Sequence, residues 1–204
     1  DIAGLVWAFA HMKLRPQTEL KREISRRLVR LDEDESRALT PSTMATVVWS
    51  YARLRAKPSK FFCRFLSDRL QTLVQKGTRM KSSVISSTIY GFARISANPG
   101  EETIRQMLEM WNSGTEEDNF GPIHSVLWGL CRLRYPLDND TFDSIHNMLA
   151  KRAQRALYQH IPKYLSALAY FKKPIHKDIF GQIIQLMETA DAKSLEDFDE
   201  PFKQ

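Results

Sequence analysis

The chain is poor in the residues that turn or cross-link a protein. Its 204 residues include 8 glycines and 9 prolines, about 8% together against a usual share of roughly 12%, which disfavours a sandwich or barrel with many tight turns. Its two cysteines, Cys63 and Cys131, show neither CxxC spacing nor paired histidines nearby, so no disulfide framework or zinc site is recognisable. No apolar run approaches the ~18 residues of a membrane span, and we expect a soluble chain without a membrane partner.

Sequence motifs of enzymes are also missing. The chain contains no GxGxxG, GxxxxGK[ST], GxSxG or HExxH pattern, and these patterns mark dinucleotide, phosphate, acyl-transfer and metalloprotease sites. Its 5 histidines have no metal-ligand spacing. We therefore expect no enzymatic activity, no cofactor, no metal and no small-molecule substrate.

Positive charge is in excess and is unevenly distributed. The formal net charge is +6, but the segment from Glu188 to the C-terminus carries six acids and two lysines, so the rest of the chain carries +10. A body this basic suits a polyanionic partner such as nucleic acid. We divide the chain into a folded domain, residues 1–190, and an acidic C-terminal tail, residues 191–204, which we expect to be poorly packed.

An internal repeat dominates the sequence. One pattern, a large residue, a small one, a large apolar one, Ala or Cys, usually Arg, and a large apolar one, occurs five times at steps of 38 to 42 residues. The copies are WAFAHM, WSYARL, YGFARI, WGLCRL and a degenerate SALAYF, beginning at residues 7, 49, 90, 128 and 166. A proline follows each copy at a nearly fixed distance: Pro16, Pro58, Pro99, Pro136 and Pro174. Self-similarity at such a period indicates a repeat architecture.

Each repeat unit is predicted to be a helical hairpin. The first helix runs through the motif, as in residues 41–55, where Thr40 can cap the free amides and the trailing proline ends the helix. Gly77 and Gly114 are placed to end second helices in the left-handed conformation. Hairpins of this kind bury their apolar faces by stacking. We therefore predict an all-α fold, an α-solenoid of about five stacked helical hairpins, and because the first hairpin, residues 1–31, begins inside a helix, we expect a longer array.

A narrow stripe of the first helices is predicted to form the binding surface. Counting from the first motif residue, positions −3, +1 and +4 share one helix face, where small or hydroxyl residues precede a long cationic or aromatic one. Arginine and aromatic rings suit phosphates and bases, and a second basic row lies just beyond. The candidate RNA-binding residues are His11, Ser50, Arg53, Ser87, Arg94, Ser125, Arg132, Lys163 and Tyr170, with Arg15, Arg55, Lys57 and Arg134 in the second row.

Structural roles for the same residues stand beside this interpretation. Arginine in the last turn is favoured by the helix dipole and can bond terminal carbonyls, and the small residues can serve close helix packing. We expect Trp49 and Trp128 to be buried between first and second helices, and the two cysteines to fill core positions. The basic segment 21–30 is followed by acids at 32–35, and we interpret it as a solvated face rather than a separate nucleic-acid patch.

The repeated motif resembles that of a known family. The segments LVWAFAHMKLRP, VVWSYARLRAKP and TIYGFARISANP are similar to the first helices of octotricopeptide and heptatricopeptide repeats, which are organellar RNA-binding helical hairpins. FAST kinase-like proteins, which often end in a RAP domain, share a similar helix. The resemblance covers about residues 1–187, although the Pro-Pro-Pro-Glu-Trp run of many octotricopeptide units is missing.

The resemblance implies an RNA-binding protein of an organelle. We expect a structural subunit or accessory factor of the mitochondrial ribosome that binds rRNA and neighbouring ribosomal proteins, with the plastid as the alternative location. An organellar RNA processing or stability factor is a further alternative. The competing class is a protein-interaction scaffold in a large organellar complex, in which the same groove holds a peptide; Arg53, Arg94 and Arg132 in register favour phosphate over peptide.

Overall fold

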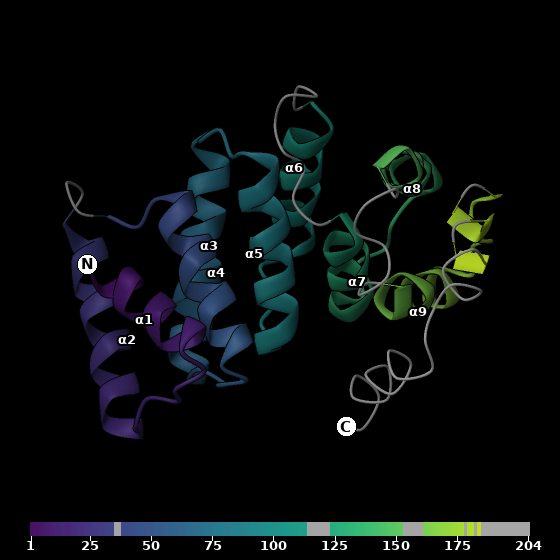
Figure 1. Cartoon of the computed structure of the whole chain (residues 1–204). Coiled ribbons are helices and arrows are strands. Elements are labelled where there is room, and N and C mark those ends of the chain that lie inside the picture. The colour runs from purple at the N-terminus through teal and green to yellow at the C-terminus, as the bar shows by residue number, and fades with distance from the viewer. Residues whose placement is uncertain (35–37, 114–122, 153–160, 178, 182, 185–204) are drawn as a thin grey trace.

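The structure, a computed structural model, is all-helical in the part that it describes (Figure 1). Residues 1–34, 38–113, 123–152, 161–177, 179–181, 183 and 184 are described. The predicted acidic tail and Gly114 lie outside these residues. The all-α prediction is confirmed for the described residues, which contain no strand.

The helices follow one another from one end of the molecule to the other (Figure 1). The five motif copies all fall on odd-numbered helices. The elements are α1 (Ile2–His11), α2 (Thr18–Glu33), α3 (Pro41–Arg53), α4 (Lys60–Gln75), α5 (Ser82–Ile95), α6 (Glu101–Asn112), α7 (Ile123–Leu133), α8 (Asn139–Arg152) and α9 (Ile161–Phe171).

Side chains just before several helices satisfy their free N-terminal amides. The Thr40 hydroxyl accepts a hydrogen bond from the Thr43 amide, and Pro41 occupies the first turn, where a missing N–H costs nothing. The Ser59 hydroxyl accepts from the Phe62 amide in the same way. These two caps fix where α3 and α4 begin, and the cap at Thr40 confirms the prediction.

The odd-numbered helices end at a left-handed residue and not at the trailing proline. In each repeat, the sixth residue after the first motif residue has a positive φ, between 49° and 56°. The amide of this residue and the next amide then bond carbonyls of the last turn, as Arg55 does to Ala52 and Ala56 does to Tyr51. The five left-handed residues are Lys13, Arg55, Ser96, Arg134 and Lys172. The prolines therefore lie beyond ends that are already set, and Gly77, with φ 67°, follows α4 as predicted.

The odd-numbered helices pack against one another in chain order. α1 contacts α3, α3 contacts α5, α5 contacts α7, and α7 contacts α9, with the most extensive contact between α3 and α5. Each odd-numbered helix from α1 to α7 also contacts the even-numbered helix that follows it, and α4 contacts α6. Large side chains from both sets of helices are fully buried between them, among them Phe62, Phe92 and Trp111.

Small residues at position +1 of the motif allow the odd-numbered helices to approach closely. A Cβ placed on Gly91 would lie 2.6 Å from Val48 Cγ2, and one on Gly129 would lie 2.7 Å from Ile89 Cγ2. Ser50 at the equivalent position of α3 is completely buried, and Ser125 is buried near the start of α7. The prediction that Ser50 and Ser125 line an open binding stripe is therefore wrong, because these small side chains face the helix packing.

A partly buried ion pair joins α2 to α4. Arg69 Nε lies 2.9 Å from Asp32 Oδ1, and both side chains are mostly shielded from solvent. Arg69 also donates to the Leu39 carbonyl, while the Leu39 amide donates to Asp32. The group ties the end of α2 and the following loop to α4.

Adding a single methyl group at Gly91 should disturb the helix row. Alanine normally stabilises a helix interior by ~1 kcal/mol over glycine, but here its Cβ would overlap Val48, and overpacking costs about 1–3 kcal/mol. We expect Gly91→Ala to lower the free energy of unfolding in urea. Gly4→Ala is the control, because its Cβ would meet nothing closer than 3.6 Å, so it should be neutral or stabilising. Equal stability of the two variants would contradict the close-packing account.

Candidate nucleic-acid interface

The open face of the odd-numbered helices carries aromatic and cationic side chains in pairs. The first motif residue and position +4 lie one turn apart on the same side of each helix. On α3 the Arg53 guanidinium carbon lies 5.3 Å from the Trp49 ring centroid, and on α7 that of Arg132 lies 5.8 Å from the Trp128 ring. Both distances are within the range of a cation–π interaction.

The aromatic side chains also meet between neighbouring helices. The His11 ring of α1 lies 5.6 Å from Trp49 of α3, and the Tyr90 ring of α5 lies 5.5 Å from Trp128 of α7. Within α1, the Trp7 and His11 rings are 3.9 Å apart. We name these five residues, Trp7, His11, Trp49, Tyr90 and Trp128, the aromatic row.

The positions of Trp49 and Trp128 correct a prediction. Both side chains are half-buried, not enclosed between first and second helices, and Trp7 is 47% exposed. A shallow hollow of about 300 Å³ opens beside Trp7 and Trp49, and it is lined by Trp7, His11, Ser42, Ala45, Thr46, Trp49, Ser83, Val84 and Ser87. The tryptophan that is completely buried is Trp111, which lies outside the motif on α6.

Cations extend along the aromatic row from α5 to α9. The Arg94 guanidinium carbon on α5 lies 5.9 Å from the Trp128 ring of the next odd-numbered helix. Lys163 reaches from α9 past α7, and its Nζ lies 5.0 Å from the Tyr90 ring centroid. Burial lowers the pKa of the Lys163 ammonium below its usual value, and the positive charge of Arg94 lowers it further. An anion bound at this point would favour the charged ammonium and so raise this pKa again.

The three arginines beside the aromatic row, Arg53, Arg94 and Arg132, differ in the groups to which they bind. Arg53 Nε donates to the Ala10 carbonyl at 3.3 Å and so caps the C-terminal end of α1. Within the described part of the chain, Arg94 and Arg132 have no carbonyl or carboxylate partner. The capping role is therefore shown for Arg53, whereas Arg94 and Arg132 are exposed cations beside aromatic rings.

Four further residues that the sequence assigned to the binding surface lie in different places. Ser87 is half-buried and lines the hollow, while Tyr170 is exposed on α9 with its ring against Phe171. Arg15 is exposed in the loop that follows α1. Lys57 lies elsewhere, in a groove between α2 and α4. Lys57 is thus separated from the surface to which the sequence assigned it.

A second row of cations occupies the left-handed helix ends. Lys13, Arg55, Arg134 and Lys172 are all exposed, and each has the positive φ described above. We name these four residues the helix-end row. Glycine is the residue best suited to this conformation, and other side chains cost about 1–2 kcal/mol there. The repeats nevertheless carry a cation at four of these five positions.

The two cysteines lie against the core of the described helices. Cys63 and Cys131 are half-buried against the core, and burial raises the pKa of both thiols, which keeps them protonated. In the described residues, no three His, Cys, Asp or Glu side chains gather as a metal site would require. None of the described helices is long and apolar enough to cross a membrane.

The sequence did not predict that the motif aromatics Trp49, Tyr90 and Trp128 are partly exposed. The signal was present, because an aromatic residue at the first motif position and a cation at position +4 must share a helix side. Comparison with known proteins adds no further guidance: no protein-family model matches the chain, and no curated protein matches its sequence. The geometry of this face and the repeat motif therefore carry the functional proposal.

Removing single arginines should separate the capping role from the exposed cations. We expect Arg53→Gln to lower the free energy of unfolding by about 0.5–1.5 kcal/mol, because the Ala10 carbonyl keeps the Lys13 amide as a donor but loses the hydrogen bond that ties α1 to α3. Arg94→Gln and Arg132→Gln should change it by less than about 0.5 kcal/mol. Urea titrations of the three variants measure this difference, and an equal loss in all three would show that all three arginines are structural.

Proposed function

We propose that this chain is an organellar helical-repeat protein that binds unpaired RNA along its odd-numbered helices. The single observation that carries the proposal is the alignment of the aromatic row with Arg94, Arg132 and Lys163 on one open face. Proteins that bind single strands combine stacking aromatic rings with a cationic track along the backbone. This face supplies both elements.

We propose an α-solenoid of about five stacked hairpins as the scaffold for this face. The sequential packing of α1, α3, α5, α7 and α9 supports it, as does the return of the same left-handed helix end in every repeat. Stacked repeats bring equivalent side chains into line along one surface. A row of this kind lets one strand contact several repeats in succession.

In the proposed complex, the aromatic row binds bases, and the cations beside it and in the helix-end row bind phosphates. Bases stack on Trp49, Tyr90 and Trp128, whose rings are partly exposed. Stacking on an aromatic ring accepts any of the four bases. Arg94 and Arg132 contact phosphates next to those rings, and the helix-end row provides further phosphate contacts. The helix-end cations stabilise the negative end of each helix dipole. Their left-handed conformation costs free energy, and binding an anion such as a phosphate offsets that cost.

The repeat motif supports a proposal for the kind of RNA and for the assembly in which the protein acts. Its resemblance to octotricopeptide and heptatricopeptide repeats leads us to propose rRNA as the RNA and the mitochondrial ribosome, with neighbouring ribosomal proteins, as the assembly. The protein acts there as a structural subunit or accessory factor. A scaffold that holds a peptide on the same face is the competing class, and two unpaired arginines beside aromatic rings favour RNA over it.

Changing the stacking surface should weaken RNA binding without unfolding the protein. We expect Trp128→Leu to reduce the affinity for oligouridine by about 1–3 kcal/mol, while Trp128→Phe, which retains a stacking ring, keeps most of it. Fluorescence anisotropy with labelled RNA measures the affinities, and thermal melting checks the fold. Phe180→Leu is the control, because Phe180 is an exposed aromatic outside the row.

The outcomes separate the proposal from a structural role. If Trp128→Phe loses as much affinity as Trp128→Leu, or if Phe180→Leu loses as much as either, base stacking on the row is not what binds the RNA. If only the melting temperature falls and the affinity of the folded variant is unchanged, Trp128 is a packing residue.

Replacing helix-end cations by glycine should change stability and binding in opposite directions. Arg55→Gly with Arg134→Gly relieves two left-handed residues, so the free energy of unfolding should rise by up to about 1 kcal/mol each. The same change removes two phosphate contacts, so the slope of log affinity against log salt should fall by about 1.4. Ser96→Gly is the matched control, because Ser96 has the same conformation without a charge.

The control fixes the interpretation of this experiment. Ser96→Gly should raise stability and leave the salt slope as in the unaltered protein. A double variant with an unchanged slope would place the helix-end row outside the RNA-binding surface.

A further inference from the structure

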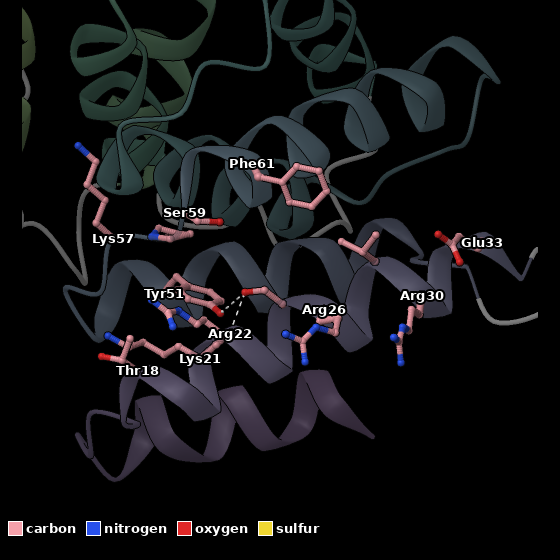
Figure 2. Close-up of a pocket in the computed structure, with 13 residues that line it drawn as sticks. Thr18, Lys21, Arg22, Arg26, Arg30, Glu33, Tyr51, Lys57, Ser59 and Phe61 are labelled. Atoms are coloured by element: carbon pink, nitrogen blue, oxygen red, sulfur yellow. Dashed lines mark hydrogen bonds between the residues drawn. The ribbon is translucent and has the colours of Figure 1, made fainter.

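A basic groove lies between α2 and the start of α4, and the RNA-binding proposal does not use it. Figure 2 shows cations of α2 along one wall, with Ser59, which precedes α4, and Phe61 of α4 on the other. Its volume is about 550 Å³. Its lining includes Arg22, Arg26, Arg30, Tyr51, Lys57 and Phe61.

The groove exists because α2 and α4 are held apart along most of their length. Their contact is much less extensive than that between α4 and α6, and Tyr51 of α3 forms the floor between them. The Tyr51 hydroxyl lies 3.3 Å from that of Ser25 on α2. At the far end, the Arg69–Asp32 ion pair joins the two helices. These two side-chain contacts hold α2 against α3 and α4 on either side of the opening.

Cations on successive turns of α2 form one wall of the groove. Arg22, Arg26 and Arg30 are spaced four residues apart, about 6 Å per step, and like charges at this spacing destabilise a helix. Arg26 is paired with Glu23 at 2.7 Å. Within the described residues, Arg22 and Arg30 have no hydrogen-bond or ion-pair partner. Glu33 is the acid among the lining residues, so the wall retains an excess of positive charge.

An exposed apolar side chain stands opposite the cations. Phe61 is 70% exposed on α4, and Val29 of α2 is half-buried in the same groove. An amphipathic helix with carboxylates four residues apart and one large apolar side chain matches both walls. Its carboxylates repeat at the same step as Arg22, Arg26 and Arg30, because both elements are α-helices.

The extent of the charge argues for a protein segment over a nucleic-acid strand. A strand needs a track that continues across several repeats, as the aromatic row does. The basic wall stops at α4, because Arg64 lies 3.7 Å from Asp68 of the same helix and on α6 Arg105 pairs with Glu102 and Glu109. The ligand site is thus confined to a single space between two helices.

We propose that the groove between α2 and α4 binds an acidic amphipathic helix of a partner protein. Phe61 provides the apolar anchor, and Arg22, Arg30 and Lys57 pair with carboxylates of the partner. Charge-assisted pairing at the edge of an apolar contact supplies specificity and fast association. The chain would then hold RNA on its odd-numbered helices and a protein on the opposite pair of helices.

A designed peptide tests the proposal directly. The probe is a fluorescein-labelled helical peptide of Glu, Ala and Leu with glutamates four residues apart on one edge and leucines on the next. It should bind the full chain in fluorescence anisotropy, and Arg22→Gln with Arg30→Gln should weaken binding about tenfold. Phe61→Ser should also weaken it. The same peptide with two central alanines replaced by prolines should not bind.

The matched control is the pair Arg94→Gln and Arg132→Gln, which removes the same charge from the RNA face. It should leave peptide affinity unchanged, while Arg22→Gln with Arg30→Gln should leave oligouridine affinity unchanged. The melting temperature of the groove variant should stay the same or rise, because repulsion along α2 is removed. Absence of peptide binding, equal binding by the proline peptide, or loss of RNA binding by the groove variant would each overturn the proposal.

Discussion

The close contact between successive odd-numbered helices is the constraint on which the proposed binding face depends. Gly91 lies against Val48, and Gly129 lies against Ile89, with no room for a Cβ at either position. Because position +1 is committed to the preceding helix, the large residue before it and the residue at +4 turn toward the open side. The small residues therefore determine both the spacing of the row and the exposure of its aromatic rings.

The ends of the same helices add charge to this arrangement. Each odd-numbered helix stops at a left-handed residue, and in four of the five repeats this residue is Lys or Arg. The second helices differ, because Arg26, Arg64 and Arg105 each pair with a carboxylate of their own helix. Within the described residues, exposed cations without a hydrogen-bond or ion-pair partner thus occur beside the aromatic row, at Arg94 and Arg132, and in the groove beside α2, at Arg22 and Arg30.

The sequence predicted the helices well because they depend on local patterns. The cap at Thr40, the left-handed Gly77 and the placement of the motif on odd-numbered helices follow from spacing along the chain. The side of each helix that faces its neighbour does not follow from this spacing. Trp49 is half-buried although its size favours the core, and Ser50 is buried although its hydroxyl favours water, because both are decided by contacts between repeats some 40 residues apart.

The central claim is that RNA lies across the first helices, and photo-crosslinking maps that contact most directly. Oligouridine containing 4-thiouridine would be irradiated with the full chain, and the crosslinked peptides identified by mass spectrometry. The account predicts crosslinks at Trp49, Tyr90 and Trp128, spread over α3, α5 and α7. Crosslinks confined to the second helices, or no crosslinks above those of an unrelated basic protein, would contradict it.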